Sequence, residues 1–241
     1  MDFVAQVETQ ASSLRSAVLK AGADAPVPSC PKWTVLDLVR HIAEVHTWAG
    51  QAVVTAPEDG RPAWPQAPQD FDDVFPWWET GLATLLERLR EAPADRPAWT
   101  FHGPQVAGFW SRRQAHETSI HRLDADLATG DDLPSLAFDP EFAADGIDEY
   151  LTTMVGRRFE LGHHVTANGR LLVHAADAGR TWQLHLTANE PLLVTAPQDS
   201  AFDEDATLAG TADAIYRAFY ARPHHAIVTG DESLLAALPR P

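Results

Sequence analysis

The spacing of apolar residues changes along the chain, and this change limits the folds that the sequence can adopt. In the first half, apolar residues recur every three or four positions, which is the period of an amphipathic helix. After about residue 160, short runs at 170–176 and 181–188 alternate partially between apolar and polar residues, as half-buried strands do. The sequence therefore predicts a helical part followed by a smaller part that mixes strands and helices.

The first part contains four helical segments joined by long loops that are rich in proline. Their apolar stripes predict helices over about 2–21, 35–53, 77–92 and 109–129. Thr34, with Asp37 three positions later, resembles a capping box at the start of the second helix, and Gly130 is suited to end the fourth. Four such helices predict a four-helix bundle.

In the second part, a further helix around 140–158 precedes the strand-like segments. The expected order is three strands at 170–176, 181–188 and 191–196, a helix over 206–222, a strand at 226–231 and a closing helix at 232–239. The predicted fold class is therefore α+β. We expect a helix-bundle domain over residues 1–158 and a small α+β domain over residues 159–241.

Charge and cysteine content narrow the classes of function. The chain has 241 residues, with 18 basic against 34 acidic side chains and a formal charge of -16, which disfavours binding to nucleic acids and to anionic membranes. Cys30 is the only cysteine, so no intramolecular disulfide forms, and a reducing compartment is expected. The sequence shows no signal peptide and no apolar run long enough to span a bilayer, so we expect a cytoplasmic protein. We also expect a monomer or a weak dimer.

Three residues in the predicted helices have side chains suited to a metal ion. Glu117 and His121 are four positions apart, so they lie on one face of a helix, and His41 on the second helix is the best third ligand. Two histidines and one carboxylate with an open position form a catalytic ligand set for Zn²⁺ and also suit Fe²⁺, Ni²⁺ or Mn²⁺. By spacing alone, the same residues also fit a polar helix face without any chemistry.

The motifs around these residues resemble those of a known family. CPKWTVLDLVRHIAEV (30–45), RRQAHETSIHRLDA (112–125), AADGIDEYL (143–151) and the segment from Gly210 to Leu235 look like motifs of the mycothiol-dependent maleylpyruvate isomerase family, in the same order. The resemblance implies a DinB-like bundle in which His41, Glu117 and His121 hold a divalent metal ion, most readily zinc. It also implies mycothiol as the thiol cosubstrate.

The resemblance also points to an arginine. Members of the family that act as isomerases use an arginine at the position of Arg222, but the usual Leu-Gly-Arg ending is here Tyr220-Ala221-Arg222. A second interpretation of Arg222 is a surface residue at a helix C-terminus, favoured by the helix dipole. We list Arg222 and His116 as candidate catalytic residues, the latter as a supporting group or proton relay.

The function that these observations predict is an isomerase or S-transferase for a small electrophile, with a metal-bound thiolate as the nucleophile. The lone Cys30 favours a thiol supplied from outside the chain. Arg113 fits two roles, a grip on a substrate carboxylate or an ion pair with Glu117 that would compete with metal binding. Two alternatives stay open: a metal-dependent hydrolase or lyase in which bound water attacks, and a non-catalytic binding module that a metal stabilises.

Overall fold

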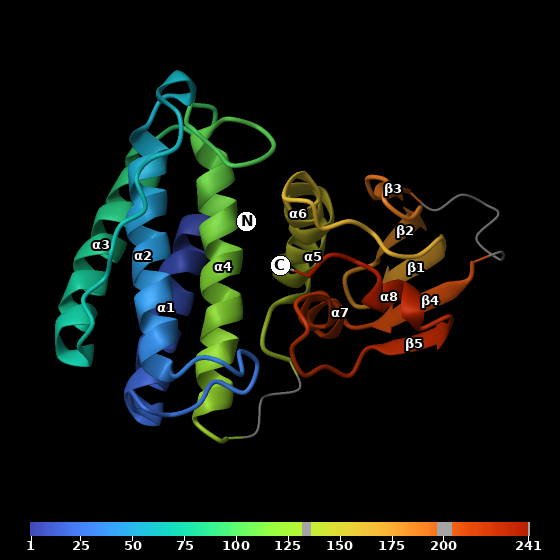
Figure 1. The fold of residues 1–241 in the computed structure, drawn as a ribbon, viewed down its shortest axis with the longest axis horizontal. Helices are drawn as coiled ribbons and strands as arrows, with labels where there is room; N and C mark the ends of the chain where they lie inside the picture. Colours follow the sequence, from blue (N-terminus) through green and yellow to red (C-terminus); the bar gives the residue numbers. More distant parts are fainter. Residues whose placement is uncertain (132–135, 197–203, 241) are drawn as a thin grey trace. The chain divides into compact units, whose positions relative to one another are not determined.

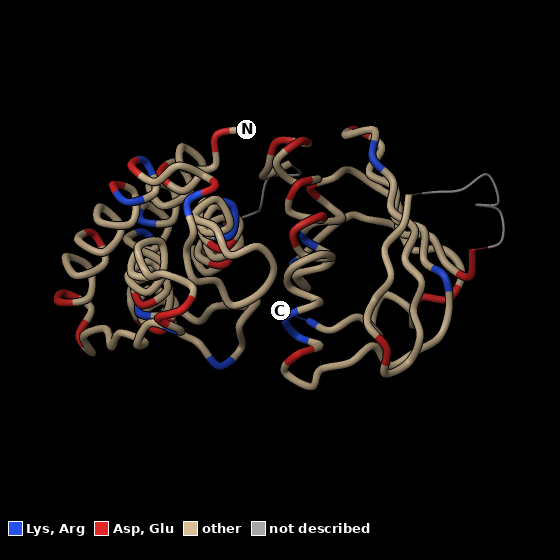
Figure 2. The backbone as a smooth tube through the Cα atoms, turned by 90° about the horizontal axis from the view of Figure 1, so that it is seen from above, with Lys and Arg blue, Asp and Glu red and all other residues tan. Residues whose placement is uncertain are grey.

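In a computed structural model of the chain, residues 1–131, 136–196 and 204–240 are described. They form two compact units, Met1–Pro134 and Ser135–Pro241, and each is considered by itself (Figure 1). Acidic residues occur along the backbone of both units (Figure 2). No helix in the described residues combines the length and the apolar character that crossing a bilayer requires.

The first unit consists of four long helices and a short 3₁₀ helix. The elements are α1 (Phe3–Ala21), α2 (Val35–Val54), η1 (Pro57–Asp59), α3 (Phe71–Glu91) and α4 (Ala107–Ala128). Helix α1 packs mainly against α4, and α2 packs against both α3 and α4. The four predicted helices are confirmed, although α3 begins at Phe71, before its expected start near Trp77, and continues through Pro76.

Local signals in the sequence fix the ends of the two helices that matter most for the site. The backbone N–H of Thr34 donates to the Asp37 carboxylate over 2.9 Å, and the Thr34 hydroxyl accepts from the Asp37 N–H, so the predicted capping box starts α2. Gly130, with φ at 76°, follows the end of α4 in the left-handed conformation that glycine adopts readily.

Two apolar clusters fill the interior of the first unit. One surrounds the first turns of α2 and includes Leu38, Ile42 and Trp78, and the other lies around Trp48 and Trp110. Trp78 and Trp110 are at most 1% exposed, whereas Trp33 is only partly buried. This core holds α2 and α4 together, and the candidate site lies on these two helices.

The second unit contains a five-stranded sheet in the order β3-β2-β1-β4-β5. Its strands are β1 (Gly169–Ala175), β2 (Arg180–Leu186), β3 (Leu193–Thr195), β4 (Ala206–Gly210) and β5 (Ile227–Gly230). Strand β4 is parallel to β1, and the other neighbouring pairs are antiparallel. The helical segments are α5 (Pro140–Glu149), the π-helix η2 (Tyr150–Met154), α6 (Val155–Glu160), α7 (Ala212–Phe219) and α8 (Ser233–Ala236).

Two details differ from the sequence-based expectation. Residues 206–210, predicted as the start of a helix, form strand β4, because pairing with β1 and β5 outweighs the helix propensity of alanine and leucine. The expected boundary after residue 158 falls inside α6, and the division lies instead between Pro134 and Ser135. The reason is that α5 packs against α7 of the second unit, a choice of neighbour that the apolar pattern of α5 does not reveal.

Candidate metal centre

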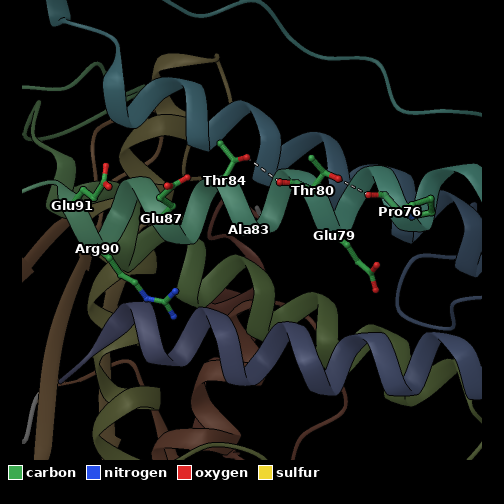
Figure 3. A pocket seen from close by; sticks show the side chains of 8 residues that line it. All are labelled: Pro76, Glu79, Thr80, Ala83, Thr84, Glu87, Arg90 and Glu91. Carbon is green, nitrogen blue, oxygen red and sulfur yellow. Dashed lines mark hydrogen bonds between the residues drawn. The ribbon is translucent and has the colours of Figure 1, made fainter.

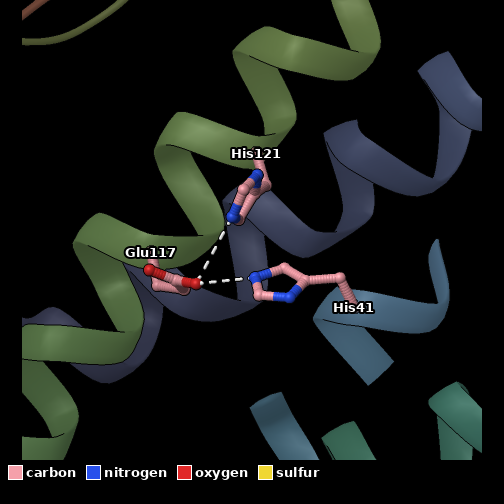
Figure 4. A group of neighbouring side chains, drawn as sticks. All are labelled: His41, Glu117 and His121. Carbon is pink, nitrogen blue, oxygen red and sulfur yellow. Dashed lines mark hydrogen bonds and ion pairs between the residues drawn. The ribbon is translucent and has the colours of Figure 1, made fainter. Parts of the chain in front are cut away.

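The three predicted ligands come together between α2 and α4 (Figure 4). His41 projects from α2, and Glu117 and His121 project one turn apart from α4. The Glu117 Oε1 atom lies 3.2 Å from Nε2 of His41 and 3.3 Å from Nε2 of His121. One ligand atom from each residue lies within 4.8 Å of the others.

Two of these separations are close to those around a tetrahedral ion, whose ligand atoms lie about 2.1 Å from the metal and roughly 3.4 Å from one another. The third separation, between the nitrogens of His41 and His121, is within 4.8 Å. Side-chain exposure is 30% for His41, 20% for Glu117 and 10% for His121, so the group faces solvent on one side. A fourth position would therefore be reachable by a small molecule.

Arg113 fixes the orientation of the Glu117 carboxylate. Its Nη2 donates to Oε2 over 2.8 Å, one turn back on α4, which leaves Oε1 directed at the two histidines. Burial alone would raise the pKa of Glu117, but hydrogen bonds from His121 and His41, and the Arg113 charge, hold it well below its ordinary value. The predicted ion pair thus exists, and it uses the oxygen that the histidines do not contact.

His121 is held from its other side by a carboxylate that is not one of the predicted site residues. Its Nδ1 lies 2.9 Å from Oδ2 of Asp124, which is completely buried. Burial by itself would lower the pKa of His121, but the hydrogen bonds to Asp124 and Glu117 raise it to about 9. Metal binding at Nε2 would require that nitrogen to be free of a proton.

The loop that precedes α2 also contacts this group. The Trp33 ring lies 5.0 Å from the His41 ring and 5.9 Å from the His121 ring, and it stacks on the latter at 28° between the ring planes. Ser29, in the same loop, donates its hydroxyl to Oδ1 of Asp124 over 2.5 Å. The Trp33 ring therefore forms an aromatic wall beside two of the predicted ligands.

The other histidine of α2 is part of the core. The indole N–H of Trp78 donates to Nδ1 of His46 over 3.0 Å, so the proton of a neutral ring lies on Nε2, 2.9 Å from the Thr118 hydroxyl. Burial lowers the pKa of His46 to about 3. His46 therefore stays neutral, and it lies outside the metal-binding group.

The two candidate catalytic residues occupy different units. His116 is completely buried in α4, with its ring 6.1 Å from that of Phe3 in α1, and it does not belong to the metal-binding group. Arg222 follows α7 in the second unit, where its Nη1 donates to the backbone oxygen of Tyr220 over 2.6 Å. Their predicted roles stay predictions.

A shallow hollow runs along the solvent side of α3 (Figure 3). It is lined by Pro76, Glu79, Thr80, Ala83, Thr84, Glu87, Arg90 and Glu91. None of the three predicted ligands lines it, and two of its charged residues are engaged with α1, Glu79 with Arg15 and Arg90 with Glu8. The hollow is therefore separate from the candidate metal centre.

Comparison with known proteins gives matches along both units. Residues 4–126 match the family described as "Mycothiol maleylpyruvate isomerase N-terminal domain", and residues 141–237 match the "MDMPI C-terminal domain". No curated protein matches the sequence.

Two solved structures share the fold. One is a mycothiol-dependent maleylpyruvate isomerase, with a TM-score of 0.66 and 14% identity, and the other is a histidine-to-alanine mutant of that enzyme, with a TM-score of 0.67 and 13% identity. Each similarity covers 99% of this chain and 95% of the solved chain. At this level of identity the similarity establishes the arrangement of the elements along the whole chain, and not the chemistry.

Proposed function

Because the chain belongs to the mycothiol maleylpyruvate isomerase family, we propose that it is a mycothiol-dependent enzyme with a divalent metal ion held by His41, Glu117 and His121. Its substrate is a small electrophile, and the reaction is an isomerisation or an S-transfer. The convergence of the three side chains on a partly exposed surface of the bundle is the observation that carries the proposal.

The donor set suits the proposed chemistry. Two imidazole nitrogens and one carboxylate oxygen leave a position open for a further ligand, as in catalytic zinc sites. A divalent ion bound there would lower the pKa of a coordinated thiol and so supply a thiolate at neutral pH. Glu117 would offer Oε1 to the ion, because Arg113 holds its Oε2, and the Trp33 ring lies beside both imidazoles.

In this proposal Arg222 binds a carboxylate of the substrate, because its planar guanidinium group can donate two parallel hydrogen bonds to a carboxylate. His116 is proposed to support Glu117, the predicted metal ligand that follows it in the chain. Replacing Arg222 with lysine keeps the positive charge but removes the bidentate geometry, so a rise in KM with bound metal unchanged is the expected signature.

Metal analysis followed by titration with mycothiol tests the proposal. We expect one divalent ion per purified chain, absent from His41→Ala and retained in His174→Ala, which removes an exposed histidine of β1 instead. Adding mycothiol to the wild-type protein should release protons or produce thiolate absorption, and neither signal should occur in His41→Ala. A wild-type protein that takes up no metal after supplementation would contradict the proposal.

The same ligands would serve two other functions. A metal-dependent hydrolase or lyase with bound water as the nucleophile would turn over substrate without any added thiol. A binding module stabilised by the ion would lose thermal stability when the metal is removed, while mycothiol would have no effect on it. The mycothiol titration, turnover without added thiol and melting with and without metal together separate the three functions.

A further inference from the structure

A buried carboxylate connects the candidate metal centre to the loop before α2. Asp124 is 0% exposed, and it accepts hydrogen bonds from two segments that are far apart in the sequence. Oδ2 accepts from Nδ1 of His121 over 2.9 Å, and Oδ1 accepts from the Ser29 hydroxyl over 2.5 Å. The Cys30 thiol adds a weaker contact to Oδ2 at 3.9 Å.

This arrangement determines which nitrogen of His121 is available. Burying a carboxylate is costly unless donors satisfy it, so Asp124 keeps a hydrogen on Nδ1 of His121 directed at Oδ2. The other nitrogen, Nε2, then faces Glu117 and His41. A ring turned over about its Cβ–Cγ bond would place the carbon Cδ2 at Asp124 and so lose this hydrogen bond, and it would also move Nε2 from its present place beside Glu117.

Ser29 limits how the carboxylate itself can turn. Its hydrogen bond occupies Oδ1, so Asp124 cannot rotate without losing it. The loop that carries Ser29 is closed on itself, because the Val27 N–H donates to the Trp33 oxygen over 3.0 Å and the Trp33 N–H donates to the Cys30 oxygen over 2.8 Å. One closed loop therefore contacts the centre twice, through Asp124 and through the Trp33 ring.

We propose that Asp124 is a positioning residue that sets metal affinity by fixing the ring of His121, and that Ser29 holds Asp124 in place. The proposal rests on the metal centre of the proposed function and adds two residues that are not ligands. Carboxylates that hold a ligating histidine by its second nitrogen typically change metal affinity 10–100-fold when they are replaced.

The affinity for Zn²⁺, measured by competition with a chromogenic chelator, tests this. Asp124→Asn should weaken binding about 10–100-fold. Ser29→Ala should weaken it by a smaller factor, because it leaves the carboxylate present. Asp126→Asn is the matched control. Asp126 lies on the same helix, but its carboxylate pairs with Arg122 and not with a predicted ligand. This variant should bind zinc as tightly as the wild type does.

A spectroscopic measurement separates positioning from a general loss of stability. In zinc-loaded protein labelled with ¹⁵N at histidine, the His121 Nδ1–H of the wild type should give a protected proton signal. That signal should shift or broaden in Asp124→Asn and stay unchanged in Asp126→Asn. Melting temperatures of all variants, with and without zinc, report any destabilisation of the bundle.

The possible results distinguish this proposal from the one that it rests on. Wild-type affinity in Asp124→Asn, with zinc lost in His41→Ala, would overturn the positioning role and leave the metal centre standing. No zinc binding by the wild type would overturn both. If Asp124→Asn does not fold, Ser29→Ala decides, since unchanged affinity and an unchanged Nδ1–H signal there would contradict the proposed chain of contacts.

Discussion

The two histidines of α2 differ in what their ring nitrogens contact. His41 is partly exposed and directs Nε2 at Glu117, whereas His46 is completely buried between Trp78 and Thr118. One is therefore available to a metal ion, and the other is a neutral hydrogen-bonded group of the core. The residue type is the same for both, but they lie five positions apart on different faces of α2, and the neighbours on each face separate their roles.

The buried His46 should make stability depend on pH in a defined window. Burial lowers the pKa of the folded His46 ring to about 3, below its ordinary value of 6.5, so folding favours the neutral ring. The contribution of His46 to the stability of the folded protein is complete above pH 6.5, and it decreases as the pH falls from 6.5 towards 3. In the range where the unfolded chain binds the proton and the folded chain does not, the free energy of unfolding falls by about 1.4 kcal/mol for each unit by which the pH is lowered.

Urea unfolding of metal-free protein at pH 7 and pH 5.5 measures this. The wild type should lose about 1 kcal/mol of stability between these two pH values through His46. His46→Gln should be less stable at pH 7 but lack this part of the pH dependence. An equal pH dependence in both proteins would show that another group is responsible.

The sequence predicts the ligands of the centre but not all of what holds them. His41, Glu117 and His121 follow from spacing and motif, and Asp124 was visible three positions after His121, where a helix brings the two side chains to one face. Ser29 gives no such signal. Its contact with Asp124 spans 95 positions of the chain and exists only because the loop before α2 folds against α4.

At the scale of elements, α2 and α3 approach each other closely at one glycine. A Cβ atom at Gly81, inside α3, would lie 2.4 Å from the Thr47 hydroxyl oxygen of α2. That oxygen makes no hydrogen bond within the described part of the chain. Gly81 therefore lowers the helix propensity of α3, and it leaves room for the Thr47 hydroxyl, which contributes no hydrogen bond within the described residues.

A double-mutant cycle should expose this conflict. Gly81→Ala in the wild type combines a gain of up to about 1 kcal/mol in helix propensity with a steric clash, so it should be neutral or destabilising. In a Thr47→Ala background the clash is removed, and the same substitution should stabilise the protein. The free energy of unfolding of the four proteins gives the coupling, and simple additivity would contradict the expectation.

The strand β4 shows which elements the sequence does not predict. Its residues, ATLAG, favour a helix by propensity, and they run directly into the Thr211 cap of α7. Their strand conformation comes from β1, which pairs with them in parallel from a distant part of the chain, and from β5 on the other side. The hairpin of β1 and β2 was predictable, because its partners are adjacent in sequence.

At the scale of the whole molecule, the proposed metal-binding residues and the proposed substrate-binding arginine belong to different units. His41, Glu117, His121, Asp124 and Ser29 all lie in Met1–Pro134, whereas Arg222 lies in Ser135–Pro241. The sequence located the change from helices to strands, but α5 and α6 have the periodicity of the bundle helices and so concealed the true division.

The first unit alone should therefore bind zinc. A chain ending at residue 134 should fold as a helical protein with an affinity for Zn²⁺ within a few-fold of the full chain, but without activity. Circular dichroism establishes the helical content, and chelator competition gives the affinity. A folded fragment without affinity for zinc would show that the second unit takes part in metal binding.

The acidic surface of both units has a consequence for kinetics. A chain with a formal charge of -16 surrounds itself with an atmosphere of cations and excludes anions, over a distance of about 10 Å at 0.1 M salt. Divalent ions are thus concentrated around the protein before they bind, while a carboxylate-bearing molecule is slowed on approach. Raising the ionic strength weakens both effects, so it slows the arrival of metal and speeds the arrival of an anionic substrate.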